Sequence, residues 1–351
     1  MHVDTLKFFK YQPIKKPIYQ GKFCRIPFDT LQIDCDGDVQ LCDCQLHMPY
    51  TIGNIFENSL SDIWTNSQAQ LVRQAVIDGD FTYCSWDCSR LPTLTPHHGV
   101  LPKVRNFPNT IKIDLDRSCN LKCPSCRETV IIEKQSDKIQ KQIQLFDEIK
   151  QWALANPQNT VTVIPLGSGE IFASHSGMKF LESLVDYPHQ NLKLHLTTNG
   201  TLITKNKELL TNIKHLIASW SISIDAATPE TYAQVRGGDW LALMNGLKFI
   251  ESIRRPLNLK FVVQQKNWHE ITAFAELAAN HNSGVYFSNL LDWGHWTIQW
   301  WKDNDVVNNA SDHYHNVLQQ LQQVKNKYPN RMTFSADIIE HLNKAQPSES
   351  A

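Results

Sequence analysis

In the last two thirds of the chain, short runs of β-branched and other apolar residues alternate with longer segments of helical periodicity. From Thr110 onward the pattern predicts six strands, at residues 111–116, 160–166, 192–197, 219–225, 257–264 and 284–291. A helix is expected after each of the first five strands, and the helix after the sixth is delayed. This alternation is typical of βα units that build a parallel sheet. Six units predict an α/β fold, a partial (β/α)6 TIM-like barrel whose active site lies at the carboxyl ends of the strands.

Apolar residues three or four positions apart mark the faces of the predicted helices that pack on the sheet. We expect these residues to be core contacts. They are Ile139, Ile143, Phe146 and Ile149 in one helix, Leu243, Leu247 and Ile250 in a second, and Val317, Leu321, Val324 and Tyr328 in a third.

The residues before the barrel form a different pattern, short and rich in cysteine. Asp36-Gly37 stands between apolar runs and predicts a hairpin turn, which places Cys42 on the return strand near Cys24. Ser59 is the expected cap of a helix that continues to Val76. Four prolines between residues 91 and 108 then predict an extended linker.

Composition narrows the class of protein. With 351 residues, 42% hydrophobic and 20% charged, the chain can bury one large domain and a smaller one. The balance of 34 basic and 35 acidic residues argues against broad electrostatic capture of nucleic acid. No apolar run approaches a membrane span, and the N-terminus lacks the apolar stretch of a secretory signal, so we expect a cytoplasmic protein. Nine cysteines in that compartment indicate metal binding rather than disulfides.

Three cysteines, Cys119, Cys123 and Cys126, directly follow the first predicted barrel strand. Three thiolates leave one iron of a 4Fe-4S cluster without a protein ligand, and a cofactor or substrate can bind at that open position. The alternative is a zinc site whose fourth ligand lies elsewhere in the chain.

The Cys-x3-Cys-x2-Cys spacing after a first strand resembles the signature of radical S-adenosylmethionine (radical SAM) enzymes. The later strand ends carry further motifs in the order that this family has them: Gly167-Ser-Gly-Glu170, Thr197-Thr-Asn-Gly200, Ser221-Ile-Ser-Ile-Asp225 and Arg236-Gly-Gly238. Together these motifs favour a cofactor-binding barrel over a zinc site.

The resemblance implies a role for each of these loops. Gly167, Gly169 and Glu170 are expected to hold the methionine amino group of the cofactor, and Asn199 in the next loop is a further expected cofactor contact. The other implied cofactor contacts are Ser223 and Asp225, at its ribose or carboxylate, and Arg236, at its carboxylate. The structural alternatives are a turn asparagine, a helix cap at Asp225 or Thr228, and a surface arginine.

One position departs from the family pattern. Many members have an aromatic residue before the third cysteine, where it can pack on adenine, but this chain has Ser125. The adenine contact is then expected from the backbone at residues 288–290.

The upstream segment, from Phe23 to Cys88, resembles the SPASM or twitch module of radical SAM enzymes. It has Cys24-x-x-Pro27, then Asp36-Gly-x-Val39, then Gly53-Asn-Ile55, then a short helix with Trp64. The module normally follows the barrel, whereas here it precedes it. The resemblance implies an auxiliary 4Fe-4S cluster held by Cys24, Cys42, Cys84 and Cys88. A structural zinc module with four cysteines is the alternative.

Two cysteines of the module, Cys35 and Cys44, remain outside that set. Cys44 can replace Cys42 as a ligand, and either spare thiol can donate a hydrogen atom to a substrate radical. Small buried apolar side chains are the structural alternative for both. After the sixth strand, Trp293, His295 and Trp296 can line a substrate pocket, with His295 as an acid-base group, or pack in a core or oligomer interface.

These observations divide the chain into six parts. They are an N-terminal segment (1–22), the SPASM/twitch-like auxiliary iron-sulfur module (23–90), a Pro-rich linker (91–109), the radical SAM partial barrel (110–300), a C-terminal helical extension (301–343) and a disordered tail (344–351).

The resemblance also implies an activity. The expected cofactors are S-adenosyl-L-methionine and two 4Fe-4S clusters, one SAM-binding and one auxiliary, with a flavodoxin- or ferredoxin-like protein as the external one-electron reductant. Reductive cleavage of S-adenosylmethionine would give a 5'-deoxyadenosyl radical that abstracts hydrogen from a substrate carbon. We expect an oxidoreductase-like enzyme acting in the cytoplasm.

The substrate of this chemistry is open to two interpretations. Likeness to SPASM-type enzymes favours a peptide or protein that is crosslinked, epimerised or oxidised. The short N-terminus shows no separate leader-peptide domain, which weighs toward the alternative, dehydrogenation or rearrangement of a sugar or other small molecule. A non-catalytic, zinc-stabilised binding protein is the hypothesis of another class. We expect no membrane partner and no nucleic-acid partner.

Overall fold

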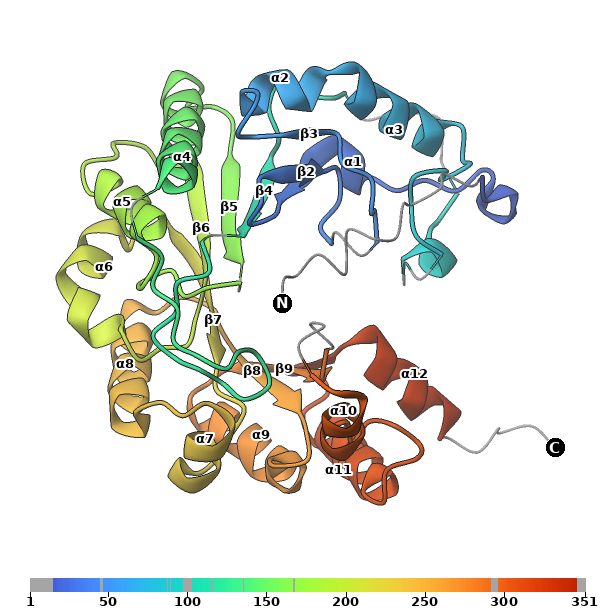
Figure 1. Ribbon diagram of the computed structural model, residues 1–351, viewed down its shortest axis with the longest axis vertical. Coiled ribbons are helices and arrows are strands. Elements are labelled where there is room, and N and C mark those ends of the chain that lie inside the picture. The colour runs from blue at the N-terminus through green and yellow to red at the C-terminus, as the bar shows by residue number, and fades with distance from the viewer. Residues whose placement is uncertain are drawn as a thin grey trace.

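The computed structural model describes residues 15–44, 47–86, 88, 90–96, 103–114, 116–134, 136–166, 168–291 and 296–345. A single ten-stranded sheet runs through both halves of this chain, in the order β10-β9-β8-β7-β6-β5-β4-β1-β2-β3. Its central six strands are parallel and curve into an open barrel with helices on the outer face, as Figure 1 shows. The fold is the predicted partial α/β barrel.

All six predicted barrel strands are present, and their ends differ from the predicted ends by no more than two residues. They are β4 (Thr110–Asp114), β5 (Val161–Leu166), β6 (Leu192–Thr198), β7 (Ile217–Ser223), β8 (Leu257–Val263) and β9 (Gly284–Asn289). The largest shifts are at β4, β7 and β9, where the loops at the carboxyl ends begin two residues earlier than predicted. More residues are therefore left in the loops that surround the site.

The outer helices pack on the sheet through the apolar faces that the sequence predicted. These helices are α4 (Asp137–Ala155), α5 (His175–Ser183), α6 (Lys207–Ile213), α7 (Pro229–Val235), α8 (Trp240–Ile253) and α9 (Ile271–Asn280). Short 3-10 turns precede two of them, η4 (Ile203–Asn206) before α6 and η5 (Trp268–Glu270) before α9. Ile143 of α4 was predicted to be a core contact but is half-buried. The buried face of the helix includes Gln142 and Leu145 instead.

The chain beyond β9 continues as α10 (Ile298–Asn304), α11 (Tyr314–Lys327), β10 (Met332–Phe334) and α12 (Ala336–Lys344). Val317, Leu321 and Val324, which the sequence predicted to share one helix face, lie in α11 and are buried. The short strand β10 was not predicted, and it pairs in parallel with β9, Met332 opposite Val285. The barrel sheet therefore extends by one strand at this edge.

The N-terminal module is built from short elements. They are η2 (Pro17–Tyr19), α1 (Ile26–Asp29), β1 (Thr30–Ile33), β2 (Asp38–Gln40), β3 (Gly53–Asn54), α2 (Leu60–Thr65), α3 (Ser67–Ile77) and η3 (Leu91–Thr93). The predicted hairpin is β1–β2, with Gly37 at φ 85° in its turn, a conformation that glycine adopts at low cost. Cys42 follows β2 rather than lying within it.

The predicted single helix after Ser59 is two helices. Ser59 caps α2 as expected, its hydroxyl accepting from the Asp62 amide at 3.1 Å. Asn66 is extended, with ψ 173°, and its side chain accepts from the Ala69 amide at 2.8 Å, so it ends α2 and caps α3. A good capping residue thus interrupts a continuous apolar pattern.

The module joins the barrel by strand pairing, which the sequence did not predict. Strand β1 pairs in parallel with β4 over four residues, from Thr30 opposite Thr110 to Ile33 opposite Ile113. On the outer side, the carboxylate of Glu148 in α4 accepts from the backbone amides of Leu60 and Ser61, each at 3.0 Å, at the start of α2. The module and barrel share one sheet and one core.

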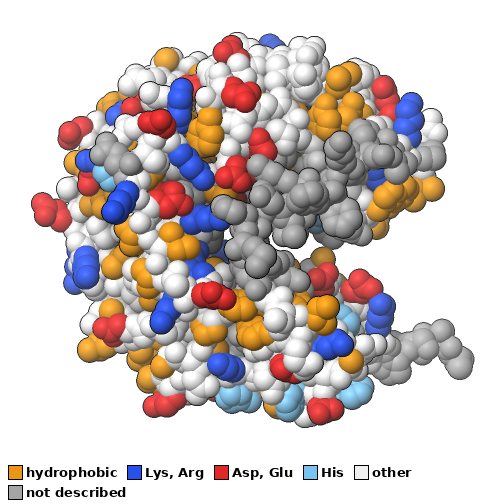
Figure 2. All heavy atoms as spheres, viewed as in Figure 1, with side chains coloured by type: hydrophobic (Ala, Val, Ile, Leu, Met, Phe, Trp, Pro, Cys, Tyr) orange, Lys and Arg blue, Asp and Glu red, His pale blue; other side chains and the backbone are white. Residues whose placement is uncertain are grey.

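Figure 1 shows that the N-terminal module and helices α10 to α12 lie on either side of the open edge of the barrel. The space-filling view in Figure 2 shows an indentation of the surface between these two parts. Of the helices formed by the described residues, none is both long enough and apolar enough to cross a bilayer.

Candidate functional site

The cysteine triplet lies in the loop after β4, at the carboxyl edge of the sheet. Backbone bonds shape this loop: the Cys119 amide donates to Ile131 at 2.7 Å, and the Cys126 amide donates to Cys123 at 2.8 Å. Arg127 joins it to the next loop by donating to the carbonyls of Arg117 and Ser168, at 2.6 and 2.7 Å. None of the nine cysteines forms a disulfide. The triplet is therefore presented from one braced loop.

A side-chain nitrogen lies near each of two of these sulfurs. Nη1 of Arg236 lies 3.7 Å from the Cys123 Sγ, and Nδ2 of Asn199 lies 3.9 Å from the Cys119 Sγ. Burial raises the pKa of both thiols, and the charge of Arg236 opposes this rise at Cys123. Donors directed at sulfur stabilise thiolate, the form that binds iron. The donor set fits a cluster bound by thiolates.

Glu170 follows β5 and is fully buried beside the triplet loop. Its Oε1 accepts from the Thr198 hydroxyl at 2.6 Å and the Phe172 amide at 3.3 Å, and its Oε2 accepts from the Asn199 amide at 2.6 Å. Burial raises the pKa of this carboxyl, and the three hydrogen bonds oppose the rise. Glu170 thus links the ends of β5 and β6 at the predicted site.

Gly169 is required by a close approach between two loops. A Cβ at this position would lie 2.3 Å from the carbonyl oxygen of Asp116 and 2.7 Å from that of Ser118. The loop after β5 therefore packs directly on the backbone that leads into the triplet. Gly167 lies outside the described residues.

Asn199 is both a turn residue and a neighbour of the triplet. Its Oδ1 accepts from the amide and hydroxyl of Thr201, at 3.0 and 2.7 Å, while its Nδ2 donates to Asn120 at 3.0 Å. Ser223 is the last residue of β7 and is half-buried on the inner face of the sheet. The structure brings both residues to the carboxyl edge that carries the cysteine loop.

Asp225 and Arg236 form a buried ion pair of 2.7 Å. Asp225 has φ 61°, and its second oxygen accepts from the Val262 amide at 2.8 Å. Burial raises the pKa of Asp225, and the Arg236 guanidinium opposes this rise. The sequence predicted separate cofactor contacts for these residues, whereas here they contact each other. The predicted cap at Thr228 is present, since its hydroxyl accepts from Thr231 at 3.3 Å.

Sequence reasoning missed a buried network under the triplet loop. Asp116 is fully buried; it accepts from the Ser118 amide at 2.9 Å and from the Ser174 hydroxyl at 2.6 Å. Ser176 continues the network to Gln142 at 2.7 Å. The one residue of this network that the sequence could have indicated is Ser174, because it is a typical helix cap and caps α5. This network fixes the start of the triplet loop to α4 and α5.

Four thiols of the N-terminal module form a group in which each lies within electrostatic reach of at least two others. Burial is the main cause that raises the pKa of Cys42 and Cys84, the latter to about 12. The charges of neighbouring thiols contribute as well. Cys84 and Cys24 raise the pKa of Cys42, and Cys24 and Cys88 raise the pKa of Cys84. These are the four residues predicted as ligands of the auxiliary cluster, and the fold gathers them from segments 64 positions apart along the chain (24 to 88).

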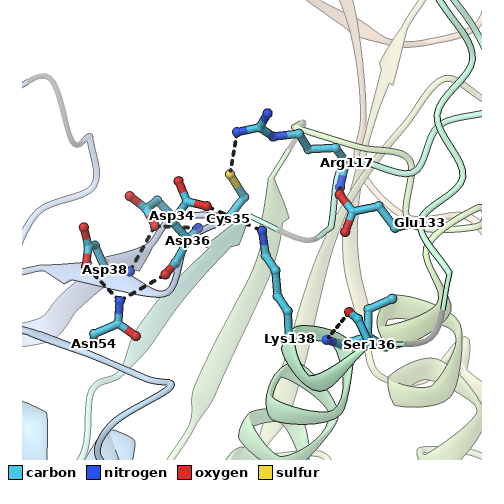
Figure 3. Close-up of polar contacts among 10 residues, drawn as sticks. Asp34, Cys35, Asp36, Asp38, Asn54, Arg117, Glu133, Ser136 and Lys138 are labelled. Carbon is cyan, nitrogen blue, oxygen red and sulfur yellow. Dashed lines mark hydrogen bonds and ion pairs between the residues drawn. The ribbon is translucent and has the colours of Figure 1, made fainter. Parts of the chain in front are cut away.

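The two remaining cysteines lie elsewhere. Cys35 occupies the β1–β2 turn, and Figure 3 shows the Arg117 guanidinium directed at its sulfur, at 3.7 Å. The same view shows Lys138 of α4 beside Asp36 at 3.6 Å, and Asn54 donating to Asp38 at 2.8 Å. Since β1 and β4 are parallel neighbours, this turn comes to the edge that carries the triplet loop.

Cys44 is near the open side of the barrel. Burial and, to a smaller extent, the charge of Asp337 raise the pKa of Tyr286 on β9, and Cys44 adds the smallest contribution. The preceding residue, Asp43, is held on two sides: its carbonyl accepts from Lys112 of β4 at 2.6 Å, and its carboxylate pairs with Arg90. The segment 42–44 therefore faces the inner side of the sheet.

Among the side chains that the structure describes, no three His, Cys, Asp or Glu converge as ligands of one metal ion would. The thiolates of a cubane cluster bind different irons, which is a wider arrangement than ligands around one ion. Seven of the nine cysteines stand in two groups, three in the triplet loop and four in the module. That division fits one cluster with an open iron and one fully ligated cluster.

The predicted pocket residues after the sixth strand are only partly described. Trp293 and His295 lie outside the described residues. Trp296 stacks on Trp300 of α10 with ring centroids 4.6 Å apart. At the expected adenine position, Ser288 is half-buried, and Asn289 donates to Asp337 of α12 at 2.8 Å. This contact links the sixth barrel strand to α12.

A partial α/β barrel with cysteine thiols at its carboxyl edge and a second cysteine group in an attached module defines a cluster-binding enzyme. The family model of the radical SAM superfamily matches residues 115–278, and that of the SPASM iron-sulfur cluster-binding domain matches residues 24–89. The chain belongs to the radical SAM superfamily, with its SPASM domain before the barrel. Its cofactors are S-adenosylmethionine and iron-sulfur clusters, one SAM-binding and one auxiliary.

Several solved structures are similar at low identity. SuiB of Streptococcus suis bound to S-adenosylmethionine is 13% identical, with a TM-score of 0.45 and coverage of 80% of this chain and 58% of that one. SuiB bound to its precursor peptide SuiA is 12% identical, with a TM-score of 0.44 and coverage of 90% and 73%. Native anSMEcpe with bound AdoMet is 17% identical, with a TM-score of 0.45 and coverage of 64% of each chain.

The chain spans 49% and 58% of the length of the first two SuiB structures that it matches. No curated protein sequence matches it.

Proposed function

We propose that this radical SAM enzyme modifies a peptide or protein, by crosslinking, epimerisation or oxidation at an unactivated carbon. The observation that carries the proposal is the position of segment 42–44. Lys112 of β4 holds Asp43 at 2.6 Å, so a loop between predicted cluster ligands faces the inner side of the barrel. Substrate bound on that face would lie between the two cysteine groups.

An open side suits an extended polypeptide better than an enclosed cavity does. Figure 2 shows the indentation between the N-terminal module and the C-terminal helices, and the half-buried positions on the inner face of the strands are mostly polar. A peptide entering there can lay one residue on the inner face while the rest of its chain stays outside. The likeness of the module to SPASM domains supports the same class of substrate.

Residues of the barrel have separable roles in the proposal. Cys119, Cys123 and Cys126 would hold the catalytic cluster, and Gly167, Gly169, Glu170 and Asn199 would hold the amino end of the cofactor. Ser223, Asp225 and Arg236 would line its ribose and carboxylate. When bound, S-adenosylmethionine supplies hydrogen-atom abstraction from carbon after one-electron reductive cleavage. The protein positions one C–H bond and excludes other hydrogen donors.

The module would provide the second redox centre. Cys24, Cys42, Cys84 and Cys88 would hold the auxiliary cluster, which would accept an electron from the substrate or bind it. A flavodoxin- or ferredoxin-like protein would supply electrons to the catalytic cluster. Cys35 and Cys44 would remain thiols, and each is a candidate hydrogen-atom donor, with His295 a candidate acid-base group.

Anaerobic reconstitution tests the assignment of the clusters. We expect about eight irons per chain from two cubane clusters, and 5'-deoxyadenosine after addition of a strong reductant and S-adenosylmethionine. Replacing Cys119, Cys123 and Cys126 together by alanine should remove about four irons and all cleavage. Bound zinc without cleavage in the unaltered protein would support the non-catalytic hypothesis instead.

A deuterium-transfer experiment tests the class of substrate. Cells grown in deuterated medium yield a peptide and protein fraction and a small-molecule fraction, and each is incubated with reconstituted enzyme. Deuterium should appear in 5'-deoxyadenosine with the polypeptide fraction alone. Transfer from the small-molecule fraction alone would replace the proposal by oxidation or rearrangement of a sugar or similar compound.

A further inference from the structure

Lys260 is a basic residue in the middle of β8 on the inner face of the sheet. Its neighbours Leu259 and Phe261 are fully buried on the outer face, where Phe261 packs on Phe274 of α9 with ring centroids 4.7 Å apart. Lys260 therefore points the other way, and it is half-buried. Its partners across the strands are Ser223 on β7 and Tyr286 on β9.

The charges around Lys260 are predominantly positive. Burial lowers the pKa of its ammonium group, and repulsion by Arg236 and Lys112 lowers it further. Asp225 is the carboxylate that acts in the opposite direction. Two cations, Arg236 and Lys112, and the carboxylate of Asp225 thus lie within electrostatic reach of Lys260.

That carboxylate is already fully engaged. One oxygen of Asp225 pairs with Arg236 at 2.7 Å, and the other accepts from the Val262 amide at 2.8 Å. Within the described part of the chain, the Lys260 ammonium has neither a hydrogen bond nor an ion pair. Lys112 differs, because its ammonium donates to the Asp43 carbonyl at 2.6 Å.

A half-buried ammonium without an acceptor, beside two other cations, is costly to the folded protein. An anion bound at Lys260 would remove that cost and gain a charge-assisted hydrogen bond. The local charges therefore favour a ligand with a negative group at this position on the inner face.

The surroundings of Lys260 indicate which molecule carries that group. On one side, Arg236 contacts the Cys123 sulfur at 3.7 Å. On the other side, Lys112 holds Asp43, and Tyr286 lies within electrostatic reach of Cys44. Lys260 is thus within electrostatic reach of one cation that contacts the triplet loop and of another that holds segment 42–44, and a substrate of the proposed function must be held in this region.

We propose that Lys260, flanked by Lys112, binds a carboxylate of the substrate, so that the modified polypeptide has an acidic side chain or a free C-terminus next to the reacting carbon. This inference rests on the proposed function, because an anion site on the inner face serves a substrate only if the substrate lies there. Lys260 is a specificity-determining residue in this proposal.

The test compares two small probes that differ by one charge, N-acetyl-glutamate amide and N-acetyl-glutamine amide. Their binding to the reconstituted enzyme, saturated with S-adenosylmethionine, is measured by equilibrium dialysis. We expect the glutamate probe to bind at least about tenfold more tightly, as the loss of one charge-assisted hydrogen bond implies. In Lys260→Met the two probes should bind equally.

Two variants control for charge and for the number of lysines. Lys260→Arg keeps the cation and should keep the preference for glutamate. Lys248→Met removes an exposed lysine on α8 and should bind both probes as the unaltered enzyme does. Iron content and the visible absorption of the clusters show whether each variant is correctly assembled.

Three results would overturn the proposal. They are an equal affinity of the unaltered enzyme for the two probes, an unchanged preference in Lys260→Met, and a tenfold loss of S-adenosylmethionine affinity in Lys260→Met. The last would assign the cation to the carboxylate of the cofactor. Failure of the proposed function would be seen in a different experiment. Deuterium transfer from small molecules alone would exclude a polypeptide substrate, but it would not contradict the binding of a substrate carboxylate by Lys260.

Discussion

The two cysteine groups of this protein are assembled in opposite ways. The triplet loop takes its three thiols from eight consecutive residues. It is braced by Arg127, by the backbone amide of Glu170, which donates to the Ser118 carbonyl, and by the buried Asp116 network. The module takes its four thiols from the whole of residues 24–88, and their proximity depends on the β1–β2 hairpin and the turns around Cys84. A local motif defines the first group, and tertiary structure defines the second.

The largest expected difference is in catalysis. Cys123→Ala removes a thiol of the triplet and should abolish S-adenosylmethionine cleavage, because Cys119 and Cys126 are themselves expected ligands and no fourth described cysteine lies in that loop. Cys42→Ala should leave reductive cleavage measurable while it lowers the iron content by up to about four per chain. Iron analysis and 5'-deoxyadenosine formation, measured on the same samples, check both outcomes. Equal loss of cleavage in the two variants would contradict the division into separate centres.

The buried ion pair beside the triplet should dominate stability in the barrel. Arg236→Met leaves the Asp225 carboxylate buried without its cation, and removal of one partner of such a pair costs about 3–5 kcal/mol. Thermal or denaturant unfolding of the apoprotein measures this change. Lys179→Met is the matched control, because it breaks an exposed pair with Glu182 at 3.1 Å and should cost no more than about 1 kcal/mol.

A double variant shows whether the charge or the packing is responsible. Asp225→Asn together with Arg236→Met should recover part of the lost stability, since no buried charge is then left unpaired. Additive losses in the double variant would show that the two side chains act independently.

The contact between module and barrel should have a smaller effect. Glu148→Gln removes the charge that caps α2 and should lower stability by about 1 kcal/mol, the usual value of a helix-terminus cap. Hydrogen exchange should increase at the amides of Leu60 and Ser61 but not within β6 or β7. A uniform increase over the whole sheet would show that module and barrel unfold as one unit.

The smallest effect is expected in the hairpin turn of the module. Burial raises the pKa of Asp34 to about 6, so ionisation of this carboxyl destabilises the folded state. Because the folded pKa exceeds the usual value of 3.8, stability falls as pH rises from about 4 to about 6.

Asp34→Asn should remove this dependence. The amide oxygen can still accept from the amides of Asp36 and Asp38, so the turn is retained. The variant should be more stable than the original protein by less than about 1 kcal/mol at pH 8, after screening of a partly exposed group. The gain should disappear at pH 4. Unfolding curves at the two pH values give the comparison, and a gain of equal size at both would refute the role of ionisation.

Features with a local cause could be predicted from the sequence. The six barrel strands, the Asp36-Gly37 turn and the Ser59 cap each depend on a few neighbouring residues. The gathering of the predicted site residues at one edge followed from the order of parallel strands. The family matches confirmed the class of enzyme and the presence of both modules.

Features that depend on distant residues could not be predicted. No pattern along the chain indicates that β1 pairs with β4, because both are short apolar strands with many possible partners. The Asp225–Arg236 pair joins residues of two loops, and Asp225 has a left-handed backbone that the sequence does not reveal. The break at Asn66 was hidden because the apolar spacing continues across it.

The pairing of β1 with β4 also protects the chain from aggregation. The row of backbone amides and carbonyls along Thr110–Asp114 would otherwise be an open parallel edge, which can pair with strands of other molecules. Strand β1 covers it, with β2 and β3 further out in the sheet, and all three are made before the barrel as the chain is synthesised. A module placed first in the sequence is therefore available to shield the barrel edge as soon as that edge exists.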